Sequence, residues 1–325
     1  MGTPAKRIGY IDIAKGIAMT LVVMGHVLFF DLYGNSVWES SKLMRFIYAF
    51  HVPFFFFLSG LVSVTDLQWS QIPKDIWKRF RFLIIPFVVI GSIYSILTHQ
   101  DLSFIFNEYK YGYWYLWVLF VFYMFSYPIA AFKSMGWANS VFLYVPVVII
   151  WIVAEHLIPE LSSSIKSTFS LSLIIHHYPY FLMGHFVKRM RIHELCFGNS
   201  YILLCAIILW SLEGHLHFRY SNYLTTYGII LVLMNVCRKI DYNNLLGKKS
   251  LSFLGINTLY IYVFHYFIID LMKTDIFMTF LPSHSNIIID LLITIVPTMI
   301  AIAFSIGIKE LIKNDKIIMR LLFGR

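Results

Sequence analysis

The sequence predicts an all-α polytopic membrane protein with ten transmembrane helices and both termini in the cytoplasm. Of its 325 residues, 59% are hydrophobic and only 13% are charged, whereas a soluble domain carries about 25% charged residues. The apolar residues occur in runs of about 18 to 23, the length that crosses the hydrocarbon core of a bilayer. Because the connections between the runs are short, we expect a single integral membrane domain over residues 1–325.

Ten segments are long and apolar enough to be spans. They cover residues 14–32, 46–64, 80–98, 113–132, 139–157, 171–189, 201–217, 222–238, 252–273 and 286–308. Lys6 and Arg7 precede the first segment and no small-residue cleavage site follows it, so we expect a retained span and not a signal peptide. No internal repeat is evident, which argues against the inverted repeats that are typical of secondary transporters.

Lysines and arginines are distributed unequally between the two sets of loops. Twenty of the 26 fall on the side that carries both termini, and the alternate loops hold ten of the 17 acidic residues. Cytoplasmic loops are enriched in Lys and Arg, which places both termini in the cytoplasm. The net charge of +9 therefore mainly reflects topology, and we expect no nucleic-acid partner.

The first span joins a cation near the membrane surface to a histidine inside the membrane. Lys15 and His26 are eleven residues apart. This is close to three helical turns, so both side chains share one face, about 16 Å apart. Asp12, three residues before Lys15, is placed for an i,i+3 pair with it. Lys15 either binds an anionic ligand or only extends toward the interface.

Other histidines also fall within predicted spans, where an ionisable side chain is costly and indicates a function or a bonding partner. They are His51 in the second span, His265 in the ninth, and His176, His177 and His185 in the sixth. A neutral histidine suits general-base chemistry, and the alternative is a hydrogen-bonded histidine that bridges two helices. For His26, which shares a face with Lys15, we favour the catalytic interpretation. No metal-ligand spacing joins the histidines, and we expect no metal.

Two clusters border the third and fourth spans. A basic loop, Lys74–Arg81, precedes the third span; it either only sets the topology or binds phosphate groups. An aromatic segment, residues 109–117, lies at the outer end of the fourth span. It is either an interfacial belt or a surface that stacks against sugar rings.

Several ordered blocks resemble the membrane acyltransferase-3 family, and within it the polysaccharide O-acetyltransferases that are similar to fucose 4-O-acetylase. Asp12, Lys15 and His26 resemble the opening motif, in which many members have arginine where this chain has Lys15. The later blocks are Phe50–Phe54 with Ser59 and Gly60, Arg79 and Arg81 with Pro86, Trp114 with Leu116, Tyr180 and Phe181 with Gly184, and Asn257–Tyr262 with His265. The resemblance covers essentially the whole chain.

The resemblance implies transfer of an acetyl or other short acyl group from cytoplasmic acyl-CoA to a glycan hydroxyl. The acceptor would be a cell-surface polysaccharide or its lipid-linked precursor, and the enzyme would lie in the bacterial inner membrane. Acetyl-CoA would be a co-substrate, with no bound cofactor. Membrane lipid is a further expected partner, and whether the chain forms a homo-oligomer stays open.

The resemblance also implies roles for individual residues. The expected catalytic residues are His26 and His51, with Asp12, Ser59, Asn257 and His265 in support. The expected acyl-CoA-binding residues are Lys15, Lys78, Arg79 and Arg81, and the expected acceptor-side aromatic residues are Trp114 and Trp117. His26 would either deprotonate the hydroxyl or carry the acyl group transiently. His51 would either orient the hydroxyl or hold His26 in its tautomer. Two other functions stay open: a transporter or flippase for a lipid-linked glycan, and a non-catalytic membrane subunit.

Overall fold

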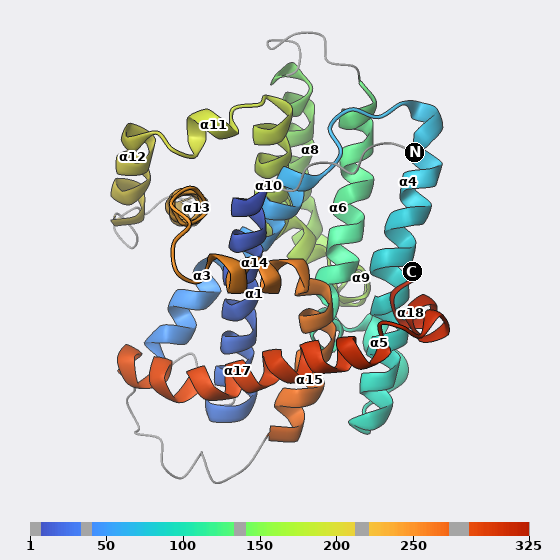
Figure 1. The fold of residues 1–325 in the computed structure, drawn as a ribbon. Coiled ribbons are helices and arrows are strands. Elements are labelled where there is room, and N and C mark those ends of the chain that lie inside the picture. Colours follow the sequence, from blue (N-terminus) through green and yellow to red (C-terminus); the bar gives the residue numbers. More distant parts are fainter. Residues whose placement is uncertain (1–7, 34–40, 133–140, 212–220, 273–285, 325) are drawn as a thin grey trace. The chain divides into compact units, whose positions relative to one another are not determined.

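The computed structural model describes residues 8–33, 41–132, 141–211, 221–272 and 286–324, and every regular element in them is a helix (Figure 1). The predicted all-α class is confirmed. Five helical segments are long and apolar enough to cross a membrane: Gly9–Phe30, Lys42–Val62, Trp69–Leu97, Trp114–Ala131 and Ile287–Ile312. A bent pair, α14 (Lys248–Ile256) and α15 (Thr258–Met272), makes a sixth if it is counted as one span. The described residues are thus those of a multi-pass membrane protein with five or six apolar spans.

The other four predicted spans coincide with helices that do not meet these criteria. They are α8 (Tyr144–Leu157), α10 (Leu171–Arg189), α12 (Ser200–Ser211) and α13 (Ser221–Tyr242). With 14 and 12 residues, α8 and α12 are short. The predicted spans 139–157 and 201–217 also extend beyond the described residues. The other two are long enough, but polar side chains such as His177 and Asn235 lower their hydropathy. The count of ten spans and the location of the termini stay predictions.

One prediction for this part of the chain is wrong, and one predicted span is bent. The basic run Lys74–Arg81 is not a loop, because η3 (Trp69–Gln71), α4 (Ile72–Arg79), the π-helix η4 (Phe80–Ile84) and α5 (Ile85–Leu97) form one helical segment. Pro73 and Pro86 lie in the first turns of α4 and α5, where proline is tolerated. The predicted span 252–273 is not one straight helix, because α14 and α15 meet at a bend of 82°.

The helices form two compact units. The first consists of the chain up to Phe55 and His193–Leu311, and the second of Phe56–Ile192 and Ile312–Arg325. The first unit contains α1 (Gly9–Val27), the π-helix η1 (Leu28–Tyr33), the first part of α3 (Lys42–Val62), α11 (His193–Cys196), α12, α13, α14, α15 and α17 (Ile287–Ile312). The second contains the rest of α3, the segment from η3 to α5, η5 (Leu102–Phe106), η6 (Lys110–Gly112), α6 (Trp114–Ala131), α8, η7 (Ile158–Glu160), α9 (Ser163–Phe169), α10 and α18 (Lys316–Phe323). Whether they act as one domain stays a prediction.

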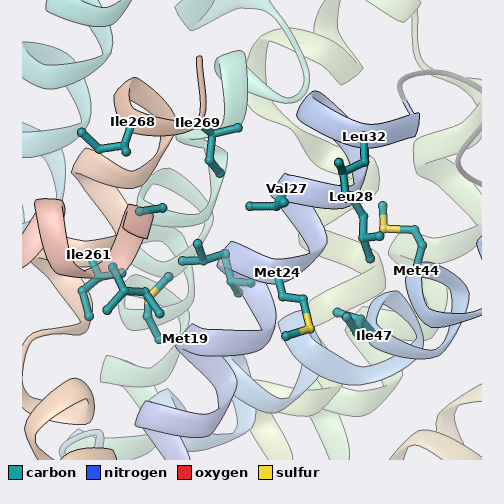
Figure 2. Close-up of a cluster of buried hydrophobic side chains, with 14 of the residues drawn as sticks. Met19, Met24, Val27, Leu28, Leu32, Met44, Ile47, Ile261, Ile268 and Ile269 are labelled. Carbon is teal, nitrogen blue, oxygen red and sulfur yellow. The ribbon is translucent and has the colours of Figure 1, made fainter. Parts of the chain in front are cut away.

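The core of the first unit surrounds α1. Figure 2 shows Met19, Met24, Val27 and Leu28 of the α1–η1 helix in a buried cluster with side chains of α3 and α15. On another side α1 packs directly against α14. A Cβ atom on Gly16 would overlap the Leu251 carbonyl, and one on Gly255 would overlap the Asp12 carbonyl. Small residues thus allow two backbones to meet at the start of α1.

The second unit contains a reciprocal glycine contact between α3 and α10. A Cβ atom on Gly60 would overlap the carbonyl oxygen of Phe181, and one on Gly184 would overlap that of Phe57. The two blocks noted in the sequence, around Ser59–Gly60 and around Phe181–Gly184, therefore meet across one helix crossing. The physical requirement at this crossing is the absence of a side chain.

Candidate functional site

The principal candidate site, in the first unit, is a chain of hydrogen-bonded side chains from α1 and α15. His26 Nδ1 lies 2.8 Å from His265 Nε2, and the two rings are nearly parallel, with an interplanar angle of 9°. The hydroxyl of Tyr266 lies 3.2 Å from His26 Nε2. His265 Nδ1 in turn lies 3.0 Å from the carbonyl oxygen of Ile261. His265 is fully buried, whereas His26 is half-buried.

This chain determines the tautomers of both neutral rings. A carbonyl oxygen can only accept, so His265 Nδ1 carries the hydrogen and donates it to Ile261. His265 Nε2 is then an acceptor, which requires His26 Nδ1 to be the donor. The lone pair of His26 consequently lies on Nε2, where the Tyr266 hydroxyl can donate to it. The basic atom of His26 is therefore Nε2, and His265 holds it in that state.

Two irregular helix features frame this chain. The π-helix η1 begins at Leu28, directly after α1; such segments are frequent at functional sites. On the other side, α15 starts after the break at Asn257, whose side-chain Nδ2 donates to the Phe253 carbonyl at 2.9 Å. Asn257 is buried and closes the end of α14. Asn257 lies eight residues before His265 on the same polypeptide segment, and its supporting role stays a prediction.

His51 lies in the same unit, on α3. Its Nδ1 donates to the carbonyl oxygen of Ile47 at 2.8 Å, which leaves the lone pair on Nε2. The side chain is buried. The group bonded to His26 Nδ1 is nevertheless His265, so His265 and not His51 holds the tautomer of His26. A role of His51 in orienting the acceptor stays a prediction.

The cationic residues of α4 and η4 form a separate cluster in the second unit. The guanidinium of Arg79 lies 4.0 Å above the ring of Tyr123 on α6, and its Nε lies 3.4 Å from Asp75. The hydroxyl of Tyr127 donates to the same carboxylate at 2.8 Å. Asp75 and two tyrosines thus fix the plane of Arg79, so that its remaining donors have a defined direction.

The neighbouring cations differ in their surroundings. Lys78 is exposed on α4, whereas Arg81 is half-buried in the π-helix. Arg81 Nε is buried and has no hydrogen-bond partner among the described residues. Lys15 belongs to the first unit and these three cations belong to the second, so a joint role in acyl-CoA binding stays a prediction.

The remaining predicted site residues have largely structural contacts. Lys15 is half-buried on α1, one turn after Asp12, and their pairing stays a prediction. Ser59 Oγ lies 3.0 Å from the hydroxyl of Tyr115. Trp114 stacks on His177 at a centroid distance of 5.4 Å, and Trp117 Nε1 donates to the carbonyl of Phe169 at 3.0 Å. Both tryptophans are half-buried, and their role toward an acceptor stays a prediction.

The sequence interpretation missed two groups of polar residues. One is Tyr266, which a search for hydroxyls next to intramembrane histidines would have found. The other lies at the end of α10, where Lys188 donates to the carbonyl of Ser63 at 2.5 Å and Arg189 donates to those of Thr65 and Ile129, both at 2.9 Å. These cations hold the segment after α3, beside the cluster around Arg79. Among the described residues, no three His, Cys, Asp or Glu side chains are grouped in a way that could hold a metal.

Comparison with known proteins gives two curated relatives. A nodulation protein NolL of Mesorhizobium japonicum is 27% identical over 188 residues, which are 53% of this chain and 46% of that protein. A nodulation protein NolL of Sinorhizobium fredii is 28% identical over 138 residues, 38% of this chain and 37% of that protein. The matched part thus spans less than half of either relative. No solved structure matches.

A family model has a far longer match than either relative. The acyltransferase-3 model, described as an acyltransferase domain, covers residues 8–308. This range contains α1 with His26, the cluster around Arg79, and α15 with His265. The chain therefore belongs to the acyltransferase-3 family.

Proposed function

We propose that this membrane acyltransferase moves an acetyl or other short acyl group from acyl-CoA to a hydroxyl of a cell-surface glycan or its lipid-linked precursor. The bacterial inner membrane is the proposed location, with the basic ends of the helices on the cytoplasmic side. The observation that carries the proposal is the hydrogen-bonded chain Ile261–His265–His26, which leaves a lone pair on His26 Nε2.

In the proposed reaction, His26 Nε2 accepts the proton of the acceptor hydroxyl. The hydroxyl oxygen then attacks the thioester carbonyl, so that a C–O ester bond forms and the C–S bond breaks. The proton passes from Nε2 to the departing thiolate, which leaves as free CoA thiol. His265 acts as a positioning residue, because its Nε2 accepts from His26 Nδ1 both before and after His26 is protonated. Transient acylation of His26 would use the same Nε2 atom.

The cluster around Arg79 supports a phosphate-bearing donor. Guanidinium groups bind phosphate by charge and by paired hydrogen bonds. The plane of Arg79 is fixed by Asp75 and Tyr123, and Arg81 has a buried Nε without a partner in the described residues. In the proposal Arg79 and Arg81 bind the CoA phosphates, with Lys78 as a further, exposed cation. Lys15, on the helix that carries His26, is proposed as another cation for the same donor.

The test replaces His26 and, as a control, replaces a second histidine that lies outside the proposed site. His26→Gln removes the basic nitrogen, while His156→Gln changes an exposed histidine of α8 whose Nδ1 donates to the carbonyl of Ile152. We expect the O-acetyl signals in NMR spectra of the purified glycan to disappear in the first strain and to remain in the second. Wild-type acetylation in His26→Gln would refute the role of His26. The donor is tested by the release of free CoA thiol when purified protein receives acetyl-CoA and deacetylated glycan.

A further inference from the structure

A polar cavity of the second unit, wide open at the surface, has no part in the chemistry proposed above. Its volume is about 510 Å³, within the range of small-molecule sites. It is lined by Glu108, which precedes η6, by Ser163, Ser164, Lys166 and Ser167 of α9, and by Ser172 of α10. Three segments of the chain thus contribute to one hollow.

Hydrogen bonds between these segments fix the walls of the cavity. Lys110, only 1% exposed, donates from Nζ to the carbonyls of Ile105, Asn107 and Thr168 at 2.7, 3.1 and 3.0 Å. Ser170 Oγ donates to the carbonyl of Glu108 at 2.8 Å. The loop before α6 is therefore attached to the end of α9 through buried bonds. A site built in this way needs little reorganisation when a ligand binds.

The same loop has an unusual backbone. Lys110 and Tyr111 both have positive φ values, 46° and 48°, and Gly112 follows at 94°. Such values are uncommon for residues other than glycine, and they persist where the surrounding structure imposes them, often near binding sites. Here the three bonds of Lys110 hold this conformation two residues after Glu108, which lines the cavity.

The lining indicates the chemical class of the ligand. Four hydroxyls provide both donors and acceptors, while one carboxylate and one ammonium group balance each other in charge. A free anion or cation would favour a surplus of one sign, and a lipid chain would favour an apolar wall. A neutral polyhydroxylated ligand matches this lining. Tyr109, next to Glu108 and 59% exposed, offers an aromatic face for a sugar ring.

The cavity and the cluster around Arg79 lie at different levels of α6. Trp117, which donates to Phe169, lies near the cavity, whereas Arg79 stacks on Tyr123 and its partner Asp75 accepts from Tyr127. Tyr123 and Tyr127 follow Trp117 by six and ten residues, about 9 and about 15 Å along the helix at 1.5 Å per residue. A polyhydroxylated ligand in the cavity would thus lie at another level of α6 than phosphate groups at Arg79.

We propose that this cavity is a saccharide-binding subsite for the acceptor glycan. Its role toward an acceptor rests on the proposed function, whereas saccharide binding itself does not. Binding and acyl transfer can therefore be measured separately on the same purified, full-length protein.

The binding experiment uses oligosaccharides released from the surface polysaccharide of a strain that lacks the gene, observed by saturation-transfer NMR. Ser164→Phe fills the cavity, and Glu108→Gln removes its carboxylate with little change in shape. Ser103→Phe is the matched control, because Ser103 is exposed in η5 but does not line the cavity. We expect binding at least tenfold weaker in the first two variants and wild-type binding in the control.

The outcomes separate the two proposals. The subsite is overturned if the wild-type protein does not bind the oligosaccharides. It is also overturned if Ser164→Phe and Glu108→Gln bind them as tightly as the wild-type protein does. Binding that is lost in both variants supports it. If the wild-type protein binds the oligosaccharides but releases no CoA thiol from acetyl-CoA, the subsite is retained and the acyl-transfer proposal fails. A thermal-unfolding profile equal to that of the control establishes that Ser164→Phe is folded.

Discussion

The most direct test of the site concerns His265, which should act only through His26. His265→Leu removes the acceptor for His26 Nδ1–H and keeps an apolar side chain of similar size in a buried position. The change leaves a buried donor without a partner, which costs about 1–3 kcal/mol. His26 can recover this energy only by moving the hydrogen to Nε2, where Tyr266 also lies. The basic lone pair would then be lost from Nε2.

The size of the effect follows from this energy. A penalty of about 1–3 kcal/mol reduces the population of the productive tautomer by about 5- to 150-fold, and kcat should fall by a similar factor. His265→Gln should recover part of the loss, because the Oε1 of glutamine can replace Nε2 as the acceptor. The assay is thiol release from acetyl-CoA by purified protein in the presence of deacetylated glycan.

Two results would refute the reasoning. A kcat for His265→Leu within about twofold of wild type would show that the tautomer of His26 does not limit the reaction. Equal losses of kcat in the Leu and Gln variants, with both proteins folded, would show that a hydrogen-bond acceptor at position 265 does not determine the rate. Because His265 does not contact the substrates in this proposal, the KM for acetyl-CoA should change little in either variant.

Three further predictions follow from the second unit and its glycine contact. Gly60→Ala should destabilise the protein by about 1–3 kcal/mol, because the new Cβ meets a backbone carbonyl; Gly307→Ala, with nothing within 4 Å, is the control in a thermal-unfolding assay. Arg79→Lys should raise the KM for acetyl-CoA about tenfold, since lysine lacks the planar fork and the stacking on Tyr123, and steady-state kinetics measure this. Burial lowers the pKa of Lys110 from 10.5 to about 8, against the opposing effect of Glu108. Above that pH the unfolded chain holds a proton that the folded chain has released, so the free energy of unfolding rises with pH. The difference in this free energy between wild type and Lys110→Met should grow by on the order of 1 kcal/mol between about pH 7 and about pH 9.5.

Each of these predictions has a contradicting result. Equal melting temperatures for the Gly60 and Gly307 variants would contradict the backbone contact. An unchanged KM in Arg79→Lys, with Lys74→Ala as an exposed control, would remove Arg79 from the donor site. A constant difference between wild type and Lys110→Met over that pH range would mean that Lys110 keeps its proton when folded.

The sequence by itself determined the helical class, the membrane location and the family. Long apolar runs with few charges leave no other solution, because a backbone in lipid must satisfy its hydrogen bonds within each segment. It also identified His26 and His265 as candidates, since a histidine in such a run is costly. The blocks around Gly60 and Gly184 could be recognised as sequence patterns, but the sequence did not show that they contact each other.

Only the tertiary structure decided which atoms interact. Residues 26 and 265 are far apart in the chain, and no helical period relates them, so their hydrogen bond and the resulting lone pair on His26 Nε2 depend on how α1 packs beside α15. The stacking of Arg79 on Tyr123, the position of the Tyr266 hydroxyl beside His26 and the cavity between Glu108 and α9 also depend on how the helices pack. Periodicity predicts which residues share a face of one helix, whereas the chemistry of this protein lies between faces of different helices.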